Sequence, residues 1–298
     1  MGKPEIDLSI IIVSYNSLSF LKDAIGSILS HPPKASYEII VVDNASTDGS
    51  AQFVKANFPA VRVITNERNF GFAKANNIAI RSSDCRFVLL MNSDCKVYEG
   101  SLDALLNFME ENPAVGVVGP RIVNSDGSIQ LSCRRFPSML NAGLHSLLTD
   151  IFPNNPFSRK YKLADVERNK PFAVDWVSGS FMLIRRKALD EIGLLDERYF
   201  MYAEDVDLCF RMWKNNWQVF YFPHASVLHY IGGSSKEKEF VSCFRMQKSI
   251  FYFFWKHYKN SFKIILIPFL AFVLSMRVLI SFIKSIFNIR SLSGNEER

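Results

Sequence analysis

The sequence predicts an α/β fold built on a doubly wound, mostly parallel sheet, followed by a helical C-terminal region. Short apolar runs alternate with amphipathic segments of helical length, which is the rhythm of a sheet with right-handed crossovers. The runs themselves are almost free of polar residues, as strands buried on both faces are. The hydrophobic content of 48% over 298 residues is ample for such a core.

The first half of the chain contains most of the predicted strand and helix pairs. Strands are expected at 8–13, 38–42, 61–64, 86–91 and 115–118. Helices are expected to about Leu29, from a cap at Ser46 or Thr47 to about Asn57, from Phe72 to Arg81, and from Gly100 to Asn112. Residues 124–128, Asn-Ser-Asp-Gly-Ser, are typical of a hairpin turn.

The second half is less periodic. Residues 132–170 predict a mobile loop or lid, in which Arg134 and Arg135 either approach phosphates or are solvated surface charges. Beyond it, strand segments are expected at 174–184, 218–222 and 226–230, with helices at 186–192 and after the acidic run at 204–207. The helix dipole and capping explain Asp207 in that run, but not the two carboxylates beside it.

The C-terminal region changes character after residue 250. A charge-free run at 264–276 is shorter than the ~20 residues of a membrane span, and bases flank it at Lys256, Lys259 and Lys263 on one side. An interfacial or re-entrant helix pair on an anionic membrane surface is favoured over a true span. The alternative is a buried or dimer-forming helix. We expect a catalytic domain at 1–235, divided at 120/121, and a membrane-associating region at 236–298.

Composition narrows the class of protein. The net charge of +6 is compatible with nucleic acid, a membrane surface or anionic substrates, and its late excess favours the membrane. Five cysteines without a CxxC pair argue against a zinc site or a disulfide framework and fit a reducing cytosol. The N-terminus lacks the basic and apolar pattern of a signal peptide, so the catalytic part is expected in the cytoplasm.

Polar residues stand at the carboxyl end of each early strand, where open α/β sheets bind ligands. The residues are Asn16, Asp43, Asn66, Asn92 and Asp94. The run Leu89 to Asp94 ends in two metal-capable side chains. No GxGxxG or GxxxxGK[ST] is present, so a dinucleotide fingerprint and a P-loop are both disfavoured.

Five motifs occur in an order that carries a resemblance. They are Ile-Val-Ser-Tyr-Asn at 12–16, Val-Val-Asp-Asn-Ala-Ser-Thr-Asp-Gly-Ser at 41–50, Asn-Phe-Gly-Phe-Ala at 69–73, Leu-Met-Asn-Ser-Asp at 90–94 and Ala-Glu-Asp-Val-Asp at 203–207. Over residues 7–235 the chain resembles the family 2 glycosyltransferases, and in particular bacterial rhamnosyltransferase-type members that build surface polysaccharides. The resemblance implies a GT-A, Rossmann-like fold, a nucleotide-sugar donor, Mg2+ or Mn2+, and inversion at the anomeric carbon.

The resemblance also implies roles for individual residues. Asp43 contacts the nucleotide base, or is only a turn former. Asn92 and Asp94 occupy the DxD position, so Asp94 is the main metal carboxylate and Asn92 contributes weakly or touches the ribose. His229 is a further metal ligand, or a structural strand histidine. The remaining donor-binding residues are expected to be Ser14, Tyr15, Asn16, Asn69, Asp175 and Trp176.

Asp205 matches the general base of the family. Inverting transfer needs one carboxylate opposite the leaving diphosphate, which removes the proton of the acceptor hydroxyl as the new bond forms. Glu204 is expected to position Asp205 or the acceptor. Together these residues predict transfer of a single sugar, because the Gln-x-x-Arg-Trp motif of processive members is absent.

The expected activity is transfer of rhamnose from dTDP-rhamnose to a lipid-linked saccharide at the cytoplasmic face of the bacterial inner membrane. Another nucleotide sugar, such as a UDP-sugar, is an alternative donor. A nucleotidyltransferase should carry a Gly-rich loop after the first strand, which is absent. A non-catalytic, membrane-associated scaffold would not need Asp43, Asp94, Asp205 and His229 together. No nucleic acid partner is expected, and a homo-oligomer is compatible with the sequence.

Overall fold

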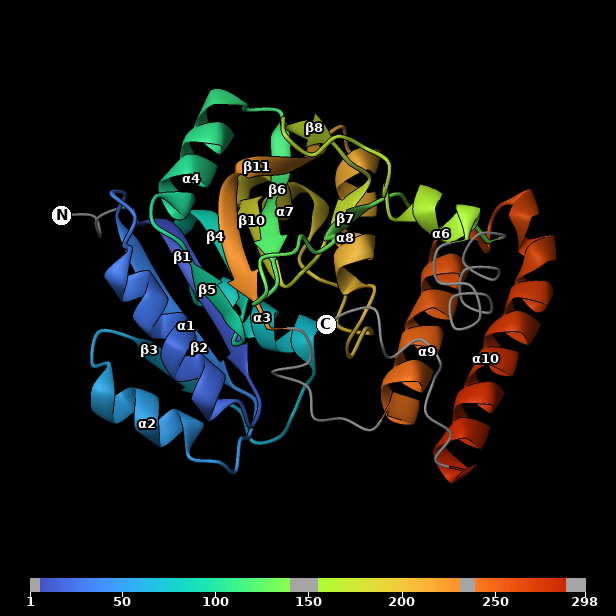
Figure 1. Ribbon diagram of the computed structural model, residues 1–298, viewed down its shortest axis with the longest axis horizontal. Helices are drawn as coiled ribbons and strands as arrows, with labels where there is room; N and C mark the ends of the chain where they lie inside the picture. The colour runs from blue at the N-terminus through green and yellow to red at the C-terminus, as the bar shows by residue number, and fades with distance from the viewer. Residues whose placement is uncertain (1–5, 140–154, 231–238, 288–298) are drawn as a thin grey trace.

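A computed structural model describes residues 6–139, 155–230 and 239–287 of the chain, and it has the expected alternation of strands and helices (Figure 1). The strands are β1 (Ile6–Ser14), β2 (Tyr37–Asp43), β3 (Arg62–Thr65), β4 (Cys85–Asn92), β5 (Cys95–Val97), β6 (Val115–Val123), β7 (Cys133–Arg134), β8 (Phe172–Ala173), β9 (Trp176–Val177), β10 (Phe181–Arg185) and β11 (Gln218–His229). The helices are α1 (Leu18–Ser30), α2 (Ser50–Asn57), α3 (Phe72–Arg81), α4 (Ser101–Glu111), α6 (Pro156–Tyr161), α7 (Arg186–Ile192), α8 (Glu204–Lys214), α9 (Glu239–Tyr258), η1 (Phe262–Leu266) and α10 (Ile267–Phe287).

One mixed sheet organises the molecule, with strand order β3-β2-β1-β4-β10-β6-β11-β5 and β8 beside β11. Strands β3, β2, β1 and β4 are parallel, and β6 is parallel to β11. Strand β10 is antiparallel to both β4 and β6 and joins the two parallel groups. The carboxyl ends of β1, β2 and β4 therefore open onto the same edge, where the sequence places its polar residues.

Alternating side chains of the strands build a separate core on each face of the sheet. Ile10 and Ile12 pack with α1, α2 and α4, whereas Ile11 between them packs with α3, α7 and α8. All three isoleucines are fully buried. Burial on both faces explains why the strand sequences are almost continuously apolar.

Local details differ from the sequence prediction, and residues 132–170, predicted as a loop or lid, include strand β7 and helix α6. Helix α2 begins at Ser50 rather than after a Ser46 or Thr47 cap, because Gly49 takes a left-handed φ of 85° and Asp48 Oδ1 accepts the Ser50 amide instead. The predicted segments at 218–222 and 226–230 form one strand, β11, with an irregularity between them. Part of the predicted lid, residues 140–154, lies outside the described residues.

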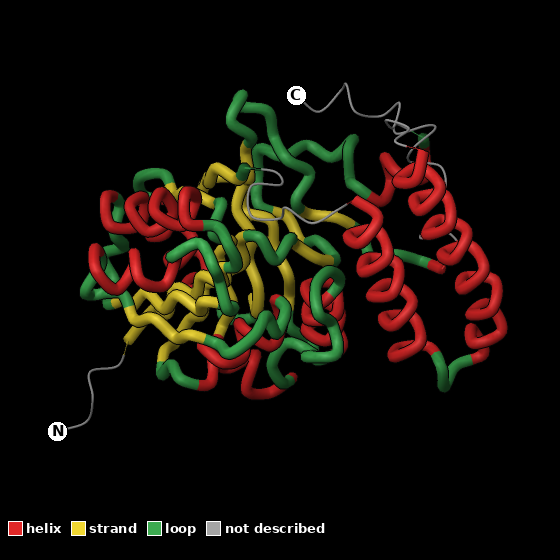
Figure 2. Tube along the Cα trace, turned by 90° about the horizontal axis from the view of Figure 1, so that it is seen from below, coloured by secondary structure: helices red, strands yellow, loops and turns green. Residues whose placement is uncertain are grey.

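Helices α9 and α10 form a hairpin that lies against the α8 side of the sheet domain (Figures 1 and 2). Phe253 of α9 and Leu270 of α10 are buried in the same core as α8. The stretch Phe262–Ile286 is long and apolar enough, by length and composition, to cross a membrane. Phe262 and Ile265 at its start are 85% and 79% exposed. The expected C-terminal helix pair is therefore present, and one of its helices exposes a large apolar surface.

Candidate active site

The loops after β1 and β2 are joined to each other at the edge of the sheet. The Asn44 amide donates to the Ser14 carbonyl at 2.8 Å, and Asn16 Oδ1 accepts the Thr47 amide at 2.7 Å. Asn16 has a φ of 52°, which turns its backbone toward the second loop. Tyr15, between them, is 47% exposed. Ser14, Tyr15, Asn16 and Asp43 therefore form one edge of the candidate site.

Asp43 is a buried carboxylate with spare hydrogen-bonding capacity. It is 2% exposed, and Oδ2 accepts the Ser46 amide at 3.2 Å. Within the described part of the chain, Oδ1 has no hydrogen-bond partner. A buried carboxylate oxygen without a donor is costly, so this atom is suited to a ligand N–H. Asn69 differs, because its Oδ1 already accepts from Asn44 and Gly71 and so shapes the neighbouring loop.

Asp94 and His229 meet because β5 pairs with the end of β11. The antiparallel register places Cys95 opposite His229, and the Tyr230 amide donates to the Asp94 carbonyl at 3.0 Å. His229 Nε2 then lies 3.3 Å from Asp94 Oδ1. Two residues that are 135 positions apart in the chain thus offer an oxygen and a nitrogen ligand to one point.

Gln130 fixes which nitrogen of His229 carries the proton. Its Nε2 donates to the His229 carbonyl at 2.8 Å and to Asn124 Oδ1 at 2.6 Å, so its Oε1 faces the ring. His229 Nδ1 lies 3.0 Å from that Oε1 and must donate to it. The lone pair of the neutral ring is therefore on Nε2, toward Asp94, which is the arrangement of a metal-ligating histidine with its supporting acceptor.

Cys95 lies close to the same point but has the properties of a core thiol. Its ligand atom and those of Asp94 and His229 all lie within 4.8 Å of one another. Burial, followed by the Asp94 charge, raises the pKa of Cys95 well above its ordinary value, and Sγ donates to the Ser180 carbonyl at 3.4 Å. The ligands at this point are therefore the Asp94 carboxylate and the His229 imidazole without a thiolate, a set that suits a hard or borderline divalent cation.

The carboxylate pair Glu204 and Asp205 begins α8. Asp205 Oδ2 accepts the Gly179 amide at 2.9 Å, and Oδ1 accepts the Val206 amide at 2.8 Å. A Cβ on Gly179 would lie 3.3 Å from the Asp205 Cβ, so the glycine permits this close approach. Glu204 is 5% exposed, and its Oε2 finds no hydrogen-bond donor among the described residues.

The surroundings of this pair set which carboxyl holds a proton. Burial, and then the Asp205 charge, raises the pKa of Glu204 well above its ordinary value. Burial also raises the pKa of Asp205, but the Gly179 and Val206 amides and the Arg134 charge oppose that effect. Asp205 is therefore the carboxyl that ionises first, and Glu204 is the one that retains a proton.

The dipeptide Gly179-Ser180 connects the two halves of the site. Gly179 holds Asp205, while the Ser180 carbonyl accepts the Asn92 amide at 2.8 Å at the end of β4. Asn92 is two residues from Asp94. One short segment thus binds both the predicted base and the strand end that leads to the predicted metal carboxylate.

Asp175 and Trp176 hold the loop after β7. Asp175 Oδ2 accepts the Phe136 amide at 2.5 Å, and the Trp176 indole N–H donates to the Arg135 carbonyl at 2.9 Å. The Arg134 guanidinium lies 5.3 Å from the Trp176 ring. The positive charge of Arg134 therefore acts on Asp205. The Trp176 ring, which is only 6% exposed, packs against the Arg134 guanidinium.

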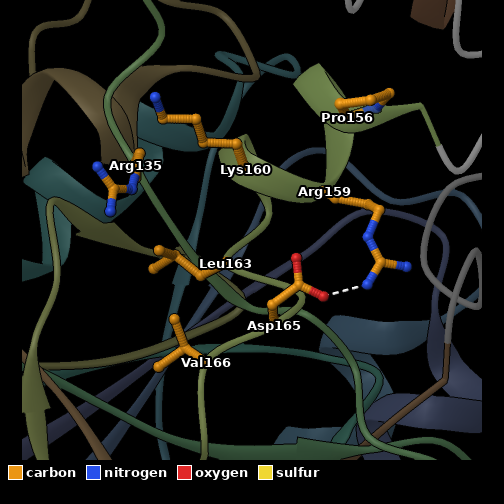
Figure 3. A pocket seen from close by; sticks show the side chains of 7 residues that line it. All are labelled: Arg135, Pro156, Arg159, Lys160, Leu163, Asp165 and Val166. Atoms are coloured by element: carbon orange, nitrogen blue, oxygen red, sulfur yellow. Dashed lines mark hydrogen bonds and ion pairs between the residues drawn. The ribbon is translucent and has the colours of Figure 1, made fainter.

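Arg135 belongs to a different surface. It lines a pocket of about 350 Å³ with Lys160, Leu163 and the ion pair of Arg159 and Asp165 (Figure 3). The pocket is lined by none of the predicted site residues. The two adjacent arginines therefore differ in environment, as neighbouring residues at a strand end do when their side chains point in opposite directions.

Comparisons with known proteins place the chain in a family. The profile described as Glycosyl transferase family 2 matches residues 9–193, and that of Glycosyl transferase family group 2 matches 159–291. The chain belongs to glycosyltransferase family 2 and is a glycosyltransferase with the GT-A fold. Asp43, Asp94 and Asp205 belong to three of the five motifs that carry the family resemblance.

Two similar proteins are rhamnosyltransferases. The chain is 36% identical over 234 residues to the N-acetylglucosaminyl-diphospho-decaprenol L-rhamnosyltransferase of Mycobacterium tuberculosis, covering 75% of this chain and 76% of the relative. It is 27% identical over 229 residues to Rhamnosyltransferase WbbL of Escherichia coli, covering 74% and 82%.

Solved structures agree in fold. A mannosyltransferase from Pyrobaculum calidifontis in complex with GDP-Man and Mn2+ has a TM-score of 0.58 and 16% identity, with 97% of this chain and 77% of that chain covered. GalNAc-T7 with UDP, GalNAc and Mn2+ has a TM-score of 0.61 and 18% identity. The match covers 88% of this chain but only 50% of that longer chain. Both neighbours were solved with Mn2+.

Proposed function

We propose that the chain is an inverting, non-processive glycosyltransferase that moves one rhamnose from dTDP-rhamnose to a lipid-linked saccharide in cell-surface polysaccharide synthesis. The observation that carries the proposal is the segment Gly179-Ser180. It orients the Asp205 carboxylate through the Gly179 amide, and through the Ser180 carbonyl it binds the end of β4, two residues before Asp94 of the Asp94 and His229 pair. The activities of the two rhamnosyltransferase relatives support rhamnose as the transferred sugar, and that of the mycobacterial relative supports the lipid-linked acceptor.

Asp205 is the base in this proposal. Its two oxygens are each held by one backbone N–H, so the carboxylate has a fixed direction and keeps lone pairs for the acceptor hydroxyl. Protonated Glu204, with its spare Oε2, can donate a hydrogen bond that orients the same acceptor. Burial raises the pKa of Asp205, and the Gly179 and Val206 amides and then the Arg134 charge oppose that effect.

Asp94 and His229 hold the divalent cation. A cation bound there supplies positive charge to the departing diphosphate of the donor. The mixed oxygen and nitrogen pair suits Mn2+ at least as well as Mg2+, because imidazole nitrogen is a poorer ligand for Mg2+. Gln130 keeps His229 in the tautomer that binds metal, with Nε2 free of hydrogen.

The edge formed by the β1 and β2 loops takes the nucleotide. Asp43 Oδ1 is placed to accept an N–H of the base, which thymine and uracil both offer at their imide. This feature supports a pyrimidine nucleotide but does not separate a dTDP-sugar from a UDP-sugar.

In this proposal the enzyme acts at the cytoplasmic face of the bacterial inner membrane, and the C-terminal hairpin associates with that membrane peripherally or by a re-entrant segment. The exposed apolar residues of η1 and α10 support the membrane association. We keep the division into a catalytic domain at 1–235 and a membrane-associating region at 236–298, although α9 shares a core with α8.

Two measurements on the full chain test the proposal. Binding of a panel of nucleotide sugars with and without Mn2+ should select one sugar, and failure to bind any of them contradicts the proposed function. Asp205→Asn should leave donor binding intact and lower transfer by about a hundredfold or more, as loss of a general base does. Asp190→Asn, at an exposed carboxylate of α7, is the matched control and should transfer normally.

A further inference from the structure

Helix α9 runs along the segment that carries the carboxylate pair. Four side chains on one face of α9 contact residues 199–207, and their positions follow the i, i+4, i+7, i+11 spacing of a single helix stripe. The four are Arg245, Ser249, Tyr252 and Lys256. Both ends of the short segment are therefore in contact with the C-terminal hairpin.

The first contacts lie just before Glu204. Ser249 Oγ donates to the Met201 carbonyl at 2.9 Å, and Ser249 is buried. The Tyr252 ring packs edge-on against Tyr199, with ring centres 4.9 Å apart. These contacts fix the chain as it enters the turn that begins α8.

The second contacts lie just after Asp205, at Asp207. The Asp207 side chain is completely buried, and its Oδ1 accepts from Lys256 Nζ at 2.6 Å and His257 Nε2 at 2.8 Å. Arg211 Nε donates to Oδ2 at 2.9 Å. Capping was the sequence-based explanation of Asp207, whereas in the structure this carboxylate joins α8 to α9. Lys256, predicted to flank a membrane segment, is turned inward.

The turn between these contacts needs outside support. Tyr202 and Ala203 have φ values of 70° and 63°, and non-glycine residues persist in this region only where surrounding contacts impose it. Helix α8 begins without a side-chain cap at Ala203. The contacts from α9 on either side are thus well placed to hold Glu204 and Asp205 in direction.

We propose that Ser249, Lys256 and His257 are positioning residues for sugar transfer, because α9 holds the backbone before Glu204 and the Asp207 carboxylate after Asp205. This inference rests on the proposed role of Asp205 as the base. It makes the hairpin part of the catalytic unit as well as an anchor, since α9 continues through η1 into α10. Displacing α9 should misdirect Asp205 without disturbing the nucleotide edge formed by β1 and β2.

Lys256→Met in the full chain is the first test, with metal-dependent transfer and donor binding both measured. We expect kcat to fall about tenfold to a hundredfold, the cost of a small misplacement of a reacting group, with donor affinity unchanged. Lys256→Arg should retain most of kcat, because a guanidinium can still donate to the Asp207 carboxylate that Lys256 binds. Lys259→Met removes the same charge from the same helix end, where the side chain is exposed, and should leave kcat unchanged.

Ser249→Ala is the second test and removes one hydrogen bond with little change in volume. We expect kcat to fall about threefold to tenfold with donor affinity unchanged. If both variants lose thermal stability but keep the kcat of the unmodified chain per folded molecule, α9 is only structural and the inference is wrong. Failure of the proposed function has a different signature, because the unmodified chain itself would then bind no nucleotide sugar.

Discussion

Replacing Gln130 by alanine tests how the metal-binding pair is oriented. The substitution removes the acceptor 3.0 Å from His229 Nδ1 and the amide that binds the His229 carbonyl at 2.8 Å. The ring is then free to rotate or to carry its proton on Nε2, where it no longer binds metal. Loss of such a supporting partner typically weakens metal affinity by about tenfold to a hundredfold, which is roughly 1.4–2.7 kcal/mol.

Calorimetric titration of Mn2+ in the presence of a saturating nucleoside diphosphate measures this effect without transfer activity. Gln218→Ala provides the matched control, because Gln218 is exposed at the opposite end of β11. We expect the Mn2+ affinity of Gln130→Ala to be about tenfold to a hundredfold below that of the control. An affinity within about twofold of the control would refute the claim that Gln130 orients His229.

Three further substitutions test other parts of the molecule. Gly71→Ala should lower the free energy of unfolding by about 2–4 kcal/mol in urea titrations, because Gly71 has a φ of 82° and a Cβ there would lie 2.2 Å from the Phe200 carbonyl oxygen. Burial tends to raise the pKa of Asp207, but the His257 hydrogen bond and two cations outweigh burial, so the pKa is lowered. The ionised Asp207 therefore stabilises the fold above pH ~4, and this stabilisation is lost as the pH falls below that value. Asp207→Asn should flatten the acid dependence of the free energy of unfolding. Replacing both Phe262 and Ile265 by serine should weaken sedimentation with anionic vesicles by about tenfold or more, since both side chains are largely exposed apolar surface.

The sequence was sufficient for features that are local. A continuous apolar run followed by Asn92 and Asp94 identifies both a buried strand and the edge of the sheet at which it ends. Both features can be recognised from consecutive residues, without knowledge of distant contacts. The acidic start of α8 was predicted for the same reason.

Contacts between distant segments escaped prediction where the family resemblance named no role for the residues. Gln130 follows a polar turn and lies between Ile129 and Leu131, with no local sign of its role, which depends on β11 returning beside it 99 residues later. Lys256 is predicted to be a surface base from its neighbours alone, since nothing local indicates the buried Asp207 49 residues away that binds it. Such pairs depend on how the sheet and helices pack in three dimensions, and the periodicity of the sequence does not predict that packing.

The anomeric configuration of the product tests the central claim most directly. The full chain would be incubated with Mn2+, dTDP-rhamnose and an N-acetylglucosaminyl-diphospho-lipid, and the product would be examined by NMR. A single base at Asp205, oriented by the Gly179 amide, predicts one added rhamnose with a configuration opposite to that of the donor. A product that retains the donor configuration would contradict the account.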